Sequence, residues 1–218
     1  MTNFLSPLIE GFIIPFLSLT YQFIPNYGIG IIILTFGIKL VFFPLTKKGF
    51  ESMKNMQLIQ PKMEEIKKRY KGDPQKMQAE IMALYKAENV NPFSSCLPQL
   101  IQLPIFIALF FSMTSDSFVN LLSQEDVYKG FIPYWIDDLS KPDMFYVLPI
   151  LIGVSTYLSQ KFSPSIATGP SAQIQKQMMY FLPFLMVFIC FKMPTGVLLY
   201  WATQTIVTGF QQYLMQKK

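Results

Sequence analysis

The chain contains no histidine and only two cysteines. Without histidine, Ser-His-Asp and Cys-His catalysis, histidine-ligated zinc and the usual general base near neutral pH are excluded. The two cysteines, Cys96 and Cys190, form no CxxC pair, which excludes a disulfide framework and a four-thiolate metal site. The sequence therefore predicts no catalytic residues, no metal site and no cofactor.

Charged residues are also scarce, and apolar residues take their place. Only 14% of the 218 residues are charged, against about a quarter in soluble domains, while 51% are hydrophobic and 16% aromatic. Long apolar runs give five candidate membrane spans, and the length fits one domain. We place the spans at residues 27–46, 97–118, 144–160, 178–192 and 196–215. Several of the apolar runs are shorter than the roughly 20 residues that cross a full bilayer, which indicates local thinning or polar cavities.

The basic residues gather on one side of these spans. The segments 46–96 and 159–177 and the C-terminal tail hold 14 of the 18 basic residues but 6 of the 13 acidic ones. The positive-inside rule then puts these segments and the C-terminus in the cytoplasm, and the N-terminus and residues 119–143 outside. The net charge of +5 is thus interpreted as a topology signal. We expect no direct nucleic-acid recognition, except contact with ribosomal RNA.

Residues 1–26 precede the first span and contain no basic residue. Pro7 and Pro15 interrupt the apolar run, so a secretory signal is not expected. We predict an amphipathic helix on the outer membrane surface, with Glu10, Ser18 and Gln22 toward water. The alternative is a sixth span, which would put the N-terminus in the cytoplasm with no basic residue to hold it there.

Residues 47–92 are the largest water-soluble segment. Apolar residues recur at heptad spacing in its first half, and Gly72-Asp73-Pro74 then ends one helix and begins another, with Asp73 as the cap. This pattern predicts an antiparallel helical hairpin in the cytoplasm, kinked at Pro61. The apolar seam residues are Met56, Ile59, Met63, Ile66, Tyr70, Met77, Ile81, Leu84 and Tyr85.

The hairpin also carries a basic cluster, which we interpret as a docking surface. The alternative is that these residues only solvate the hairpin and set the topology. The cluster consists of Lys67, Lys68, Arg69 and Lys71. The segment at 161–177, the second cytoplasmic loop, carries fewer basic residues.

Lys39 is a charged residue inside the first span. A charge at this depth costs about 3 kcal/mol, and no Asp or Glu lies in the apolar runs of the other spans to neutralise it. One interpretation is that the lysine side chain reaches toward the cytoplasmic surface near Pro44. The other is that Lys39 faces a polar groove and attracts an anionic group.

Further polar residues follow helical spacing in the same and neighbouring spans. Each of them alone is more typical of an interhelical hydrogen bond than of a site, but together with Lys39 they predict a hydrophilic groove open to the cytoplasm. They are Thr35, Gln99, Gln102, Tyr200, Trp201, Thr203, Gln204, Thr208 and Gln211.

Three blocks of the sequence resemble the YidC–Oxa–Albino family of membrane-protein insertases. They are YGIGIIILTFGIKLVFFPLTKKGFESMKNMQLIQPK (27–62), ALYKAENVNPFSSCLPQLIQLPIFIALF (83–110) and MPTGVLLYWATQTIVTGFQQYLM (193–215). The resemblance implies an all-α polytopic membrane protein with a five-helix transmembrane core, an outer-surface amphipathic helix and a cytoplasmic helical hairpin. It also implies residence in the bacterial cytoplasmic (inner) membrane.

The resemblance further implies roles for single residues. The basic groove residue of the family falls on Lys39, the groove glutamine on Gln102, and the aromatic pair that contacts substrate on Tyr200 and Trp201, with Gln204 one turn on. The chain departs from the family in having no large outer domain, no lipoprotein signal and only a short basic tail. Expected partners are nascent membrane proteins and the lipid bilayer, with ribosome and signal-recognition machinery as transient partners and a Sec-type translocon as a further candidate.

The function predicted from these features is insertion of membrane proteins without an energy source. Acidic and hydrophilic segments would enter the groove beside Lys39, and the apolar helix would leave laterally into lipid. The main alternative is a small-solute transporter or channel with a cationic midpoint site, although no internal repeat is found. An intramembrane enzyme is disfavoured because the apolar runs of the spans lack His and Asp.

Overall fold

The computed structural model describes residues 5–91, 97–123, 130–162 and 170–216, and this part of the chain is helical without named strands. The predicted all-α class is therefore confirmed. The elements are α1 (Ser6–Leu8), the π-helical turn η2 (Ile9–Ile13), α2 (Ile14–Phe23), α3 (Tyr27–Val41), α4 (Phe43–Leu58), α5 (Gln60–Arg69), α6 (Pro74–Ala87), α7 (Leu97–Met113), α8 (Asp116–Leu122), α9 (Val147–Phe162), α10 (Pro170–Cys190) and α11 (Thr195–Gln216).

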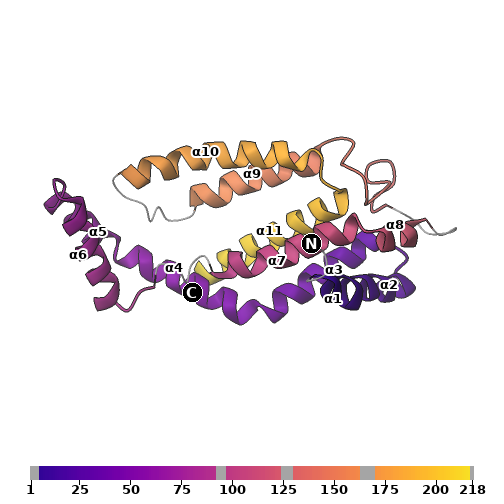
Figure 1. The fold of residues 1–218 in the computed structure, drawn as a ribbon, viewed down its shortest axis with the longest axis horizontal. Coiled ribbons are helices and arrows are strands. Elements are labelled where there is room, and N and C mark those ends of the chain that lie inside the picture. The colour runs from indigo at the N-terminus through magenta and orange to yellow at the C-terminus, as the bar shows by residue number, and fades with distance from the viewer. Residues whose placement is uncertain (1–4, 92–96, 124–129, 163–169, 217–218) are drawn as a thin grey trace.

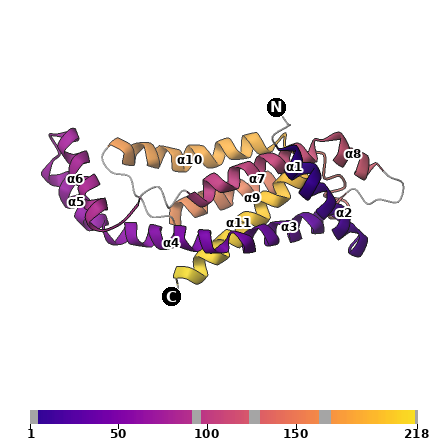
Figure 2. The ribbon, with the colours of Figure 1, turned by 60° about the horizontal axis from the view of Figure 1, so that its bottom comes forward.

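Helix α11 lies at the centre of the bundle. It contacts α3, α9, α7 and α4, while α9 pairs with α10 in one layer and α2 packs on α3 in another (Figures 1 and 2). We call the end at which α3, α9 and α11 begin the rim end, and the opposite end, where α5 and α6 stand, the hairpin end. The main core includes Leu17, Ile31, Leu109, Leu139 and Leu198.

The first predicted span is broken. Helix α3 ends at Val41 and α4 begins at Phe43, with a bend of 62° between them. The cause is Pro44 in the first turn of α4, because its nitrogen cannot donate to the Leu40 carbonyl one turn earlier and its ring crowds that carbonyl. The helix therefore breaks before the predicted span boundary at residue 46, and the chain continues as α4 to Leu58; the boundary of the span itself stays a prediction.

The second and fourth spans also differ from their predicted bounds. Helix α7 ends at Met113, and Ser115 caps the separate helix α8 by accepting a hydrogen bond from the Phe118 amide at 3.2 Å. The expected loop at 161–177 is shorter than predicted, because α10 begins at Pro170. Its first turns are rich in Gln, Lys and Ala, which favour helix, and Pro170 suits a first helical position.

Tests of length and hydropathy on the described helices find no single helix that qualifies as a membrane span. Two bent pairs qualify together, α3 with α4 and Leu100–Met113 with α8, the second bent by 56°. Apolar stretches of α9 and α10, at Val147–Leu158 and Tyr180–Cys190, are shorter. The five spans and their sidedness thus stay predictions.

The hairpin end has a small core of its own. Met56, Ile59 and Met63 are buried there together with Val90, and Ile81, Leu84 and Tyr85 pack against them. The predicted cap is confirmed, since the Asp73 side chain accepts a hydrogen bond from the Lys76 amide at 3.0 Å and Pro74 begins α6. The expected kink falls at Ile59, just before Pro61 in the first turn of α5.

The N-terminal segment is helical from Ser6 to Phe23 despite Pro7 and Pro15. Ile9, Ile13 and Leu17 are buried against the bundle. Glu10 and Gln22 are exposed as expected, and Ser18 is half-buried. Its position on a membrane surface stays a prediction.

Candidate functional site

Lys39 lies in the last turn of α3 and is buried, with 8% of its surface exposed. Its Nζ donates a hydrogen bond to Thr208 Oγ1 of α11 at 2.8 Å. Thr208 in turn donates to the backbone oxygen of Gln204 at 2.8 Å. The ammonium group is therefore held by a neighbouring helix, and not extended into water as the first interpretation required.

No acid of the described residues balances the charge of Lys39. Among the described residues the ion pairs are Lys47–Glu51, Lys62–Glu88 and Lys141–Asp138, and none involves Lys39. An ammonium group has three N–H donors, and Thr208 accepts from one of them. The site thus combines a buried cation with unused donor capacity.

A second polar contact lies nearer the rim end. Gln102 Nε2 of α7 donates to the Tyr200 hydroxyl of α11, and Phe106 packs edge-on against Trp201 with ring centroids 5.0 Å apart. Tyr200 is only 1% exposed and Trp201 is half-buried. These contacts join α7 to α11, whereas the Lys39 contact joins α3 to α11.

The remaining predicted groove residues lie on the same helices. Thr35 is buried and donates to the Ile31 carbonyl at 2.7 Å, and Thr203 is half-buried. The Gln211 Oε1 atom is buried with no hydrogen-bond partner in the described part of the chain. Gln99 lies on α7, but its side chain is outside the described residues.

These side chains surround α11 on two sides. Sequence reasoning found the polar residues from their helical spacing, but it missed Phe106 and the pairing of each contact. Within the described ranges no group of three His, Cys, Asp or Glu side chains could hold a metal ion.

The basic cluster of the hairpin is mostly exposed. Lys68, Arg69 and Lys71 are exposed, and Lys67 is half-buried. Burial lowers the pKa of Lys67, and the nearby Glu64 carboxylate opposes this shift. Sequence reasoning missed that Lys62 pairs with Glu88 at 2.6 Å, which ties α5 to the end of α6.

The rim end is closed by residues 130–146, which sequence reasoning treated only as a loop. The Asn26 side chain donates to the Phe131 carbonyl at 3.1 Å, and the Thr195 and Gly196 amides donate to the Lys141 and Leu139 carbonyls at 2.7 and 2.9 Å. This segment therefore fastens the first turns of α3 and α11 to each other. We call it the rim clasp.

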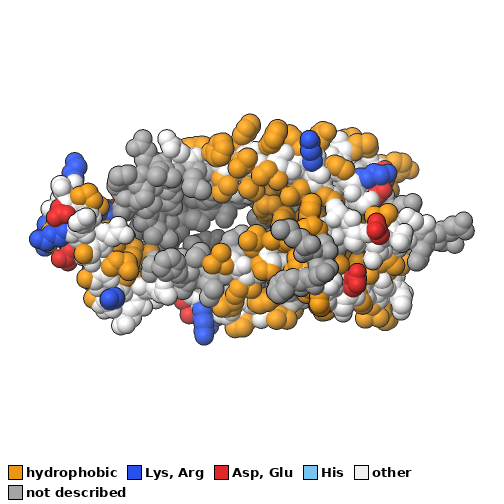
Figure 3. Space-filling model, viewed as in Figure 1, with side chains coloured by type: hydrophobic (Ala, Val, Ile, Leu, Met, Phe, Trp, Pro, Cys, Tyr) orange, Lys and Arg blue, Asp and Glu red, His pale blue; other side chains and the backbone are white. Residues whose placement is uncertain are grey.

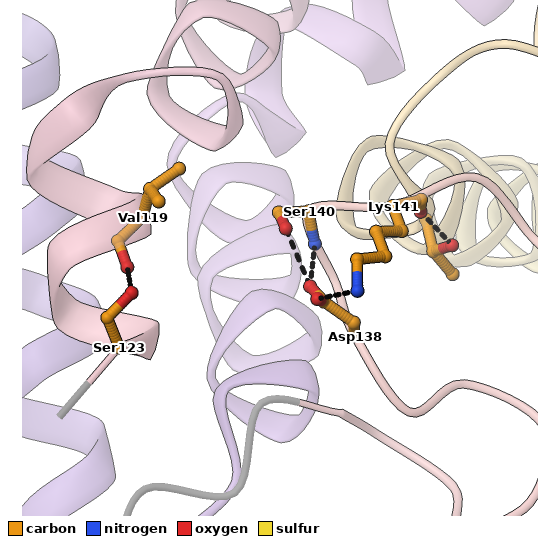
Figure 4. A network of polar contacts seen from close by, with 6 residues as sticks. Val119, Ser123, Asp138, Ser140 and Lys141 are labelled. Carbon is orange, nitrogen blue, oxygen red and sulfur yellow. Dashed lines mark hydrogen bonds and ion pairs between the residues drawn. The ribbon is translucent and has the colours of Figure 1, made fainter. Parts of the chain in front are cut away.

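Two carboxylates order the rim clasp internally. Asp138 accepts from the Ser140 hydroxyl and amide and pairs with Lys141 at 3.2 Å (Figure 4). Burial alone raises the pKa of Asp138, but these partners outweigh it and hold the pKa below its usual value. Asp143 is 3% exposed and accepts from Trp135 Nε1 at 2.8 Å and from the Leu148 amide at 2.8 Å.

Broad exposed apolar faces on the described helices, together with a buried lysine, are typical of the class of membrane proteins. The model of one family, described as 60Kd inner membrane protein, matches residues 19–218. The chain belongs to the 60Kd inner membrane protein family, and is accordingly a membrane protein.

Curated relatives of the chain carry one name. The chain is 39% identical over 201 residues to "Membrane protein insertase YidC" of Wigglesworthia glossinidia brevipalpis, covering 92% of this chain and 35% of that protein. It is 42% identical over 197 residues to the protein of the same name from Cupriavidus pinatubonensis, covering 90% and 33%. The chain thus spans about a third of the length of these relatives.

A solved structure has the same fold. It is described as "Active YidC insertase crystal structure with the first transmembrane domain resolved", with a TM-score of 0.69 and 29% sequence identity. The similarity covers 96% of this chain and 46% of that one.

Proposed function

We propose that this protein is a membrane-protein insertase that binds hydrophilic and acidic segments of nascent membrane proteins beside Lys39. The observation that carries the proposal is a buried ammonium group with one neutral acceptor, Thr208, inside a chain whose relatives are named insertases. Burying a charge costs free energy unless it is paired. An incoming carboxylate would supply the missing partner.

The path of the substrate follows from the position of α11. Lys39 lies at its contact with α3, and Gln102 and Phe106 lie at its contact with α7. A polar segment would enter from the hairpin end and replace Thr208 as the acceptor of Lys39. Its apolar helix would then pass into lipid along α3 and α11, driven by transfer of apolar surface out of water.

The deciding experiment replaces Lys39 in cells depleted of their own insertase. Lys39→Ala should impair the insertion of a reporter with an acidic translocated tail, and Lys39→Arg should restore it because the charge is kept. Lys54→Ala, on the exposed surface of α4, is the matched control and should insert normally. Normal insertion of the acidic reporter by Lys39→Ala would contradict the proposal that Lys39 binds acidic segments of the substrate.

A separate experiment tests whether hydration of the predicted groove is required for insertion. Gln102→Leu and Gln204→Leu remove polar groups but keep Lys39, so they should impair acidic and neutral reporters alike if hydration is what matters. Crosslinks from a photoreactive residue at Thr203 to a nascent membrane protein would place the substrate on α11. Solute flux through proteoliposomes, without crosslinks, would instead indicate a transporter.

The hairpin is proposed as the docking surface for the machinery that delivers the substrate. Lys68, Arg69 and Lys71 form an exposed basic surface, which suits the phosphates of ribosomal RNA. Signal-recognition components and a Sec-type translocon are further proposed partners. Neutralising the three residues together should weaken ribosome binding to the purified protein, and the loss should shrink as salt is raised.

A further inference from the structure

A patch of exposed apolar residues lies at the rim end of α9 and α10. Phe145 and Met144 are 56% and 62% exposed, and Tyr146 is 49% exposed. The Tyr146 ring packs edge-on against Phe191 of the turn after α10, with centroids 5.0 Å apart. We call Met144, Phe145, Tyr146 and Phe191 the rim patch.

The backbone at the rim patch includes one strained residue. Tyr146 has φ of 56°, a left-handed conformation that non-glycine residues rarely adopt. It persists because the buried Asp143 fixes the turn, accepting from the Phe145 amide at 3.1 Å and the Leu148 amide at 2.8 Å. Figure 3 shows apolar side chains over the described part of this layer. Such an ordered turn with exposed aromatic rings is consistent with a surface that contacts another molecule.

The rim patch continues into the apolar face of the α9–α10 pair. On α9 the exposed residues Ile150 and Val154 follow Tyr146 at intervals of one turn, and on α10 Phe188 and Phe184 precede Phe191 at similar intervals. Because the chain is a membrane protein, we expect that face to meet lipid tails. The rim patch lies at the end of this face, where we expect lipid tails to give way to headgroups.

The chemistry of the rim patch fits that boundary. Tyrosine combines an apolar ring with a polar hydroxyl and favours the membrane interface. Lys192 directly follows Phe191, is exposed, and makes no ion pair within the described residues. The neighbouring rim lysine, Lys141, is already paired with Asp138. Within the described part of the rim, Lys192 is therefore a cation available to a phosphate at this level.

We propose that the rim patch and Lys192 form a lipid-headgroup site, in which the aromatic side chains seat in the interface and Lys192 binds the phosphate of an anionic phospholipid. The occupant is a membrane lipid of the leaflet at the rim end. This site is separate from the contacts of Lys39 and fixes the height and tilt of the α9–α10 pair in the bilayer.

The first test measures depth. Single cysteines at Phe145 and Met144 in a chain with Cys96→Ala and Cys190→Ala are spin-labelled in liposomes of phosphatidylcholine and phosphatidylglycerol. Collision with oxygen and with a water-soluble nickel chelate should place both labels at the phosphate level. Labels at Val154 and at the exposed Gln75 of the hairpin are the controls for lipid and for water. Labels at Phe145 and Met144 as accessible to nickel as the one at Gln75 would overturn the proposal.

The second test measures lipid preference. A fluorophore at Met144→Cys is quenched by acyl-labelled phosphatidylglycerol or phosphatidylcholine at equal mole fraction. The anionic lipid should be enriched up to about fivefold, as expected for one cation near a membrane surface. Lys192→Gln should abolish the preference, while Lys54→Gln should leave it unchanged. Equal quenching by the two lipids, or a preference that survives Lys192→Gln, would contradict the site. Neither readout requires insertion activity, so this proposal and the proposed function fail independently.

Discussion

Lys39 and Tyr200 each place a polar group inside an apolar bundle and find its partner on another helix. Lys39 donates to Thr208, and Tyr200 accepts from Gln102. In both cases the partner is far away in sequence, separated by 169 and 98 residues. Helical spacing can place each residue on a face, but it does not say which helix that face meets.

The Lys39–Thr208 hydrogen bond should be measurable by a double-mutant cycle. Thr208→Val keeps the shape and removes the acceptor, and it should lower the free energy of unfolding by about 1.5–3 kcal/mol, as for hydrogen bonds to charged groups. In a Lys39→Met chain the same change should cost much less. The measurement is tryptophan fluorescence during denaturation in mixed micelles.

The control for this cycle is Thr205→Val. Thr205 donates only to the Trp201 carbonyl of its own helix, at 2.9 Å. It should show the same small effect whether residue 39 is lysine or methionine. Equal costs of Thr208→Val in both backgrounds would mean that the two side chains are not coupled.

The Gln102–Tyr200 contact predicts an asymmetry between single and double changes. Tyr200→Phe leaves the half-buried Gln102 amide without its acceptor and should cost about 1 kcal/mol of stability. Adding Gln102→Leu removes the unsatisfied group and should recover much of the loss. The free energies of unfolding in mixed micelles compare the variants. If the double variant is clearly less stable than Tyr200→Phe alone, the asymmetry is absent.

At the scale of elements, local sequence signals predicted the start of one helix and missed other helix boundaries. Asp73 caps α6 and Ser115 caps α8, but only the first was recognised, because an apolar run obscured the second. The bend after α3 depends on Pro44, whose position was known, yet the length of the apolar run favoured one continuous span. The start of α10 at Pro170 was missed because the hydropathy of its first turns resembles that of a loop.

The first turn of α11 is close-packed at Gly196. A Cβ atom there would lie 2.8 Å from Met113 Sδ and 3.3 Å from the Leu139 carbonyl. Gly196→Val should therefore destabilise the bundle by about 1–3 kcal/mol through overpacking. The control is Gly209→Ala, where nothing lies within 4 Å; it should stabilise the same helix by roughly 0.5–1 kcal/mol. Thermal unfolding in detergent compares the two, and equal melting temperatures would contradict the packing argument.

The rim clasp should respond to acid. The pKa of Asp138 is held below its usual value in the folded protein, so its ionised form contributes stability above the unfolded-state pKa. That contribution should be lost as the pH falls through the folded-state pKa. Asp138→Asn should be less stable at neutral pH and should show a flatter dependence on pH in the acidic range. Parallel curves for both chains, from melting temperatures across acidic pH, would exclude this role.

At the scale of the whole molecule, basic and acidic residues gather at opposite ends of the long axis. The basic cluster stands at the hairpin end, and the rim clasp with its acidic residues stands at the other end (Figure 1). This polarity could be predicted from the sequence, because basic residues are counted by segment. The bundle itself could not, since it depends on how α11 meets each of the other helices.

The predicted sidedness can be tested in intact cells. Single cysteines replacing Lys192 and Lys68, in a chain without Cys96 and Cys190, are treated with a membrane-impermeant maleimide. Lys192→Cys should react from outside, and Lys68→Cys should react only after the membrane is opened. The reverse pattern would invert the orientation of the whole chain.

The central position of α11 has a consequence for biogenesis. Each of the helices it contacts, α3, α4, α7 and α9, precedes it in the chain. During translation these helices are therefore complete before their common neighbour exists, and Lys39 is made before its acceptor Thr208. A protein that we propose to bind the incomplete helical bundles of other membrane proteins is thus itself an incomplete bundle until its own α11 leaves the ribosome.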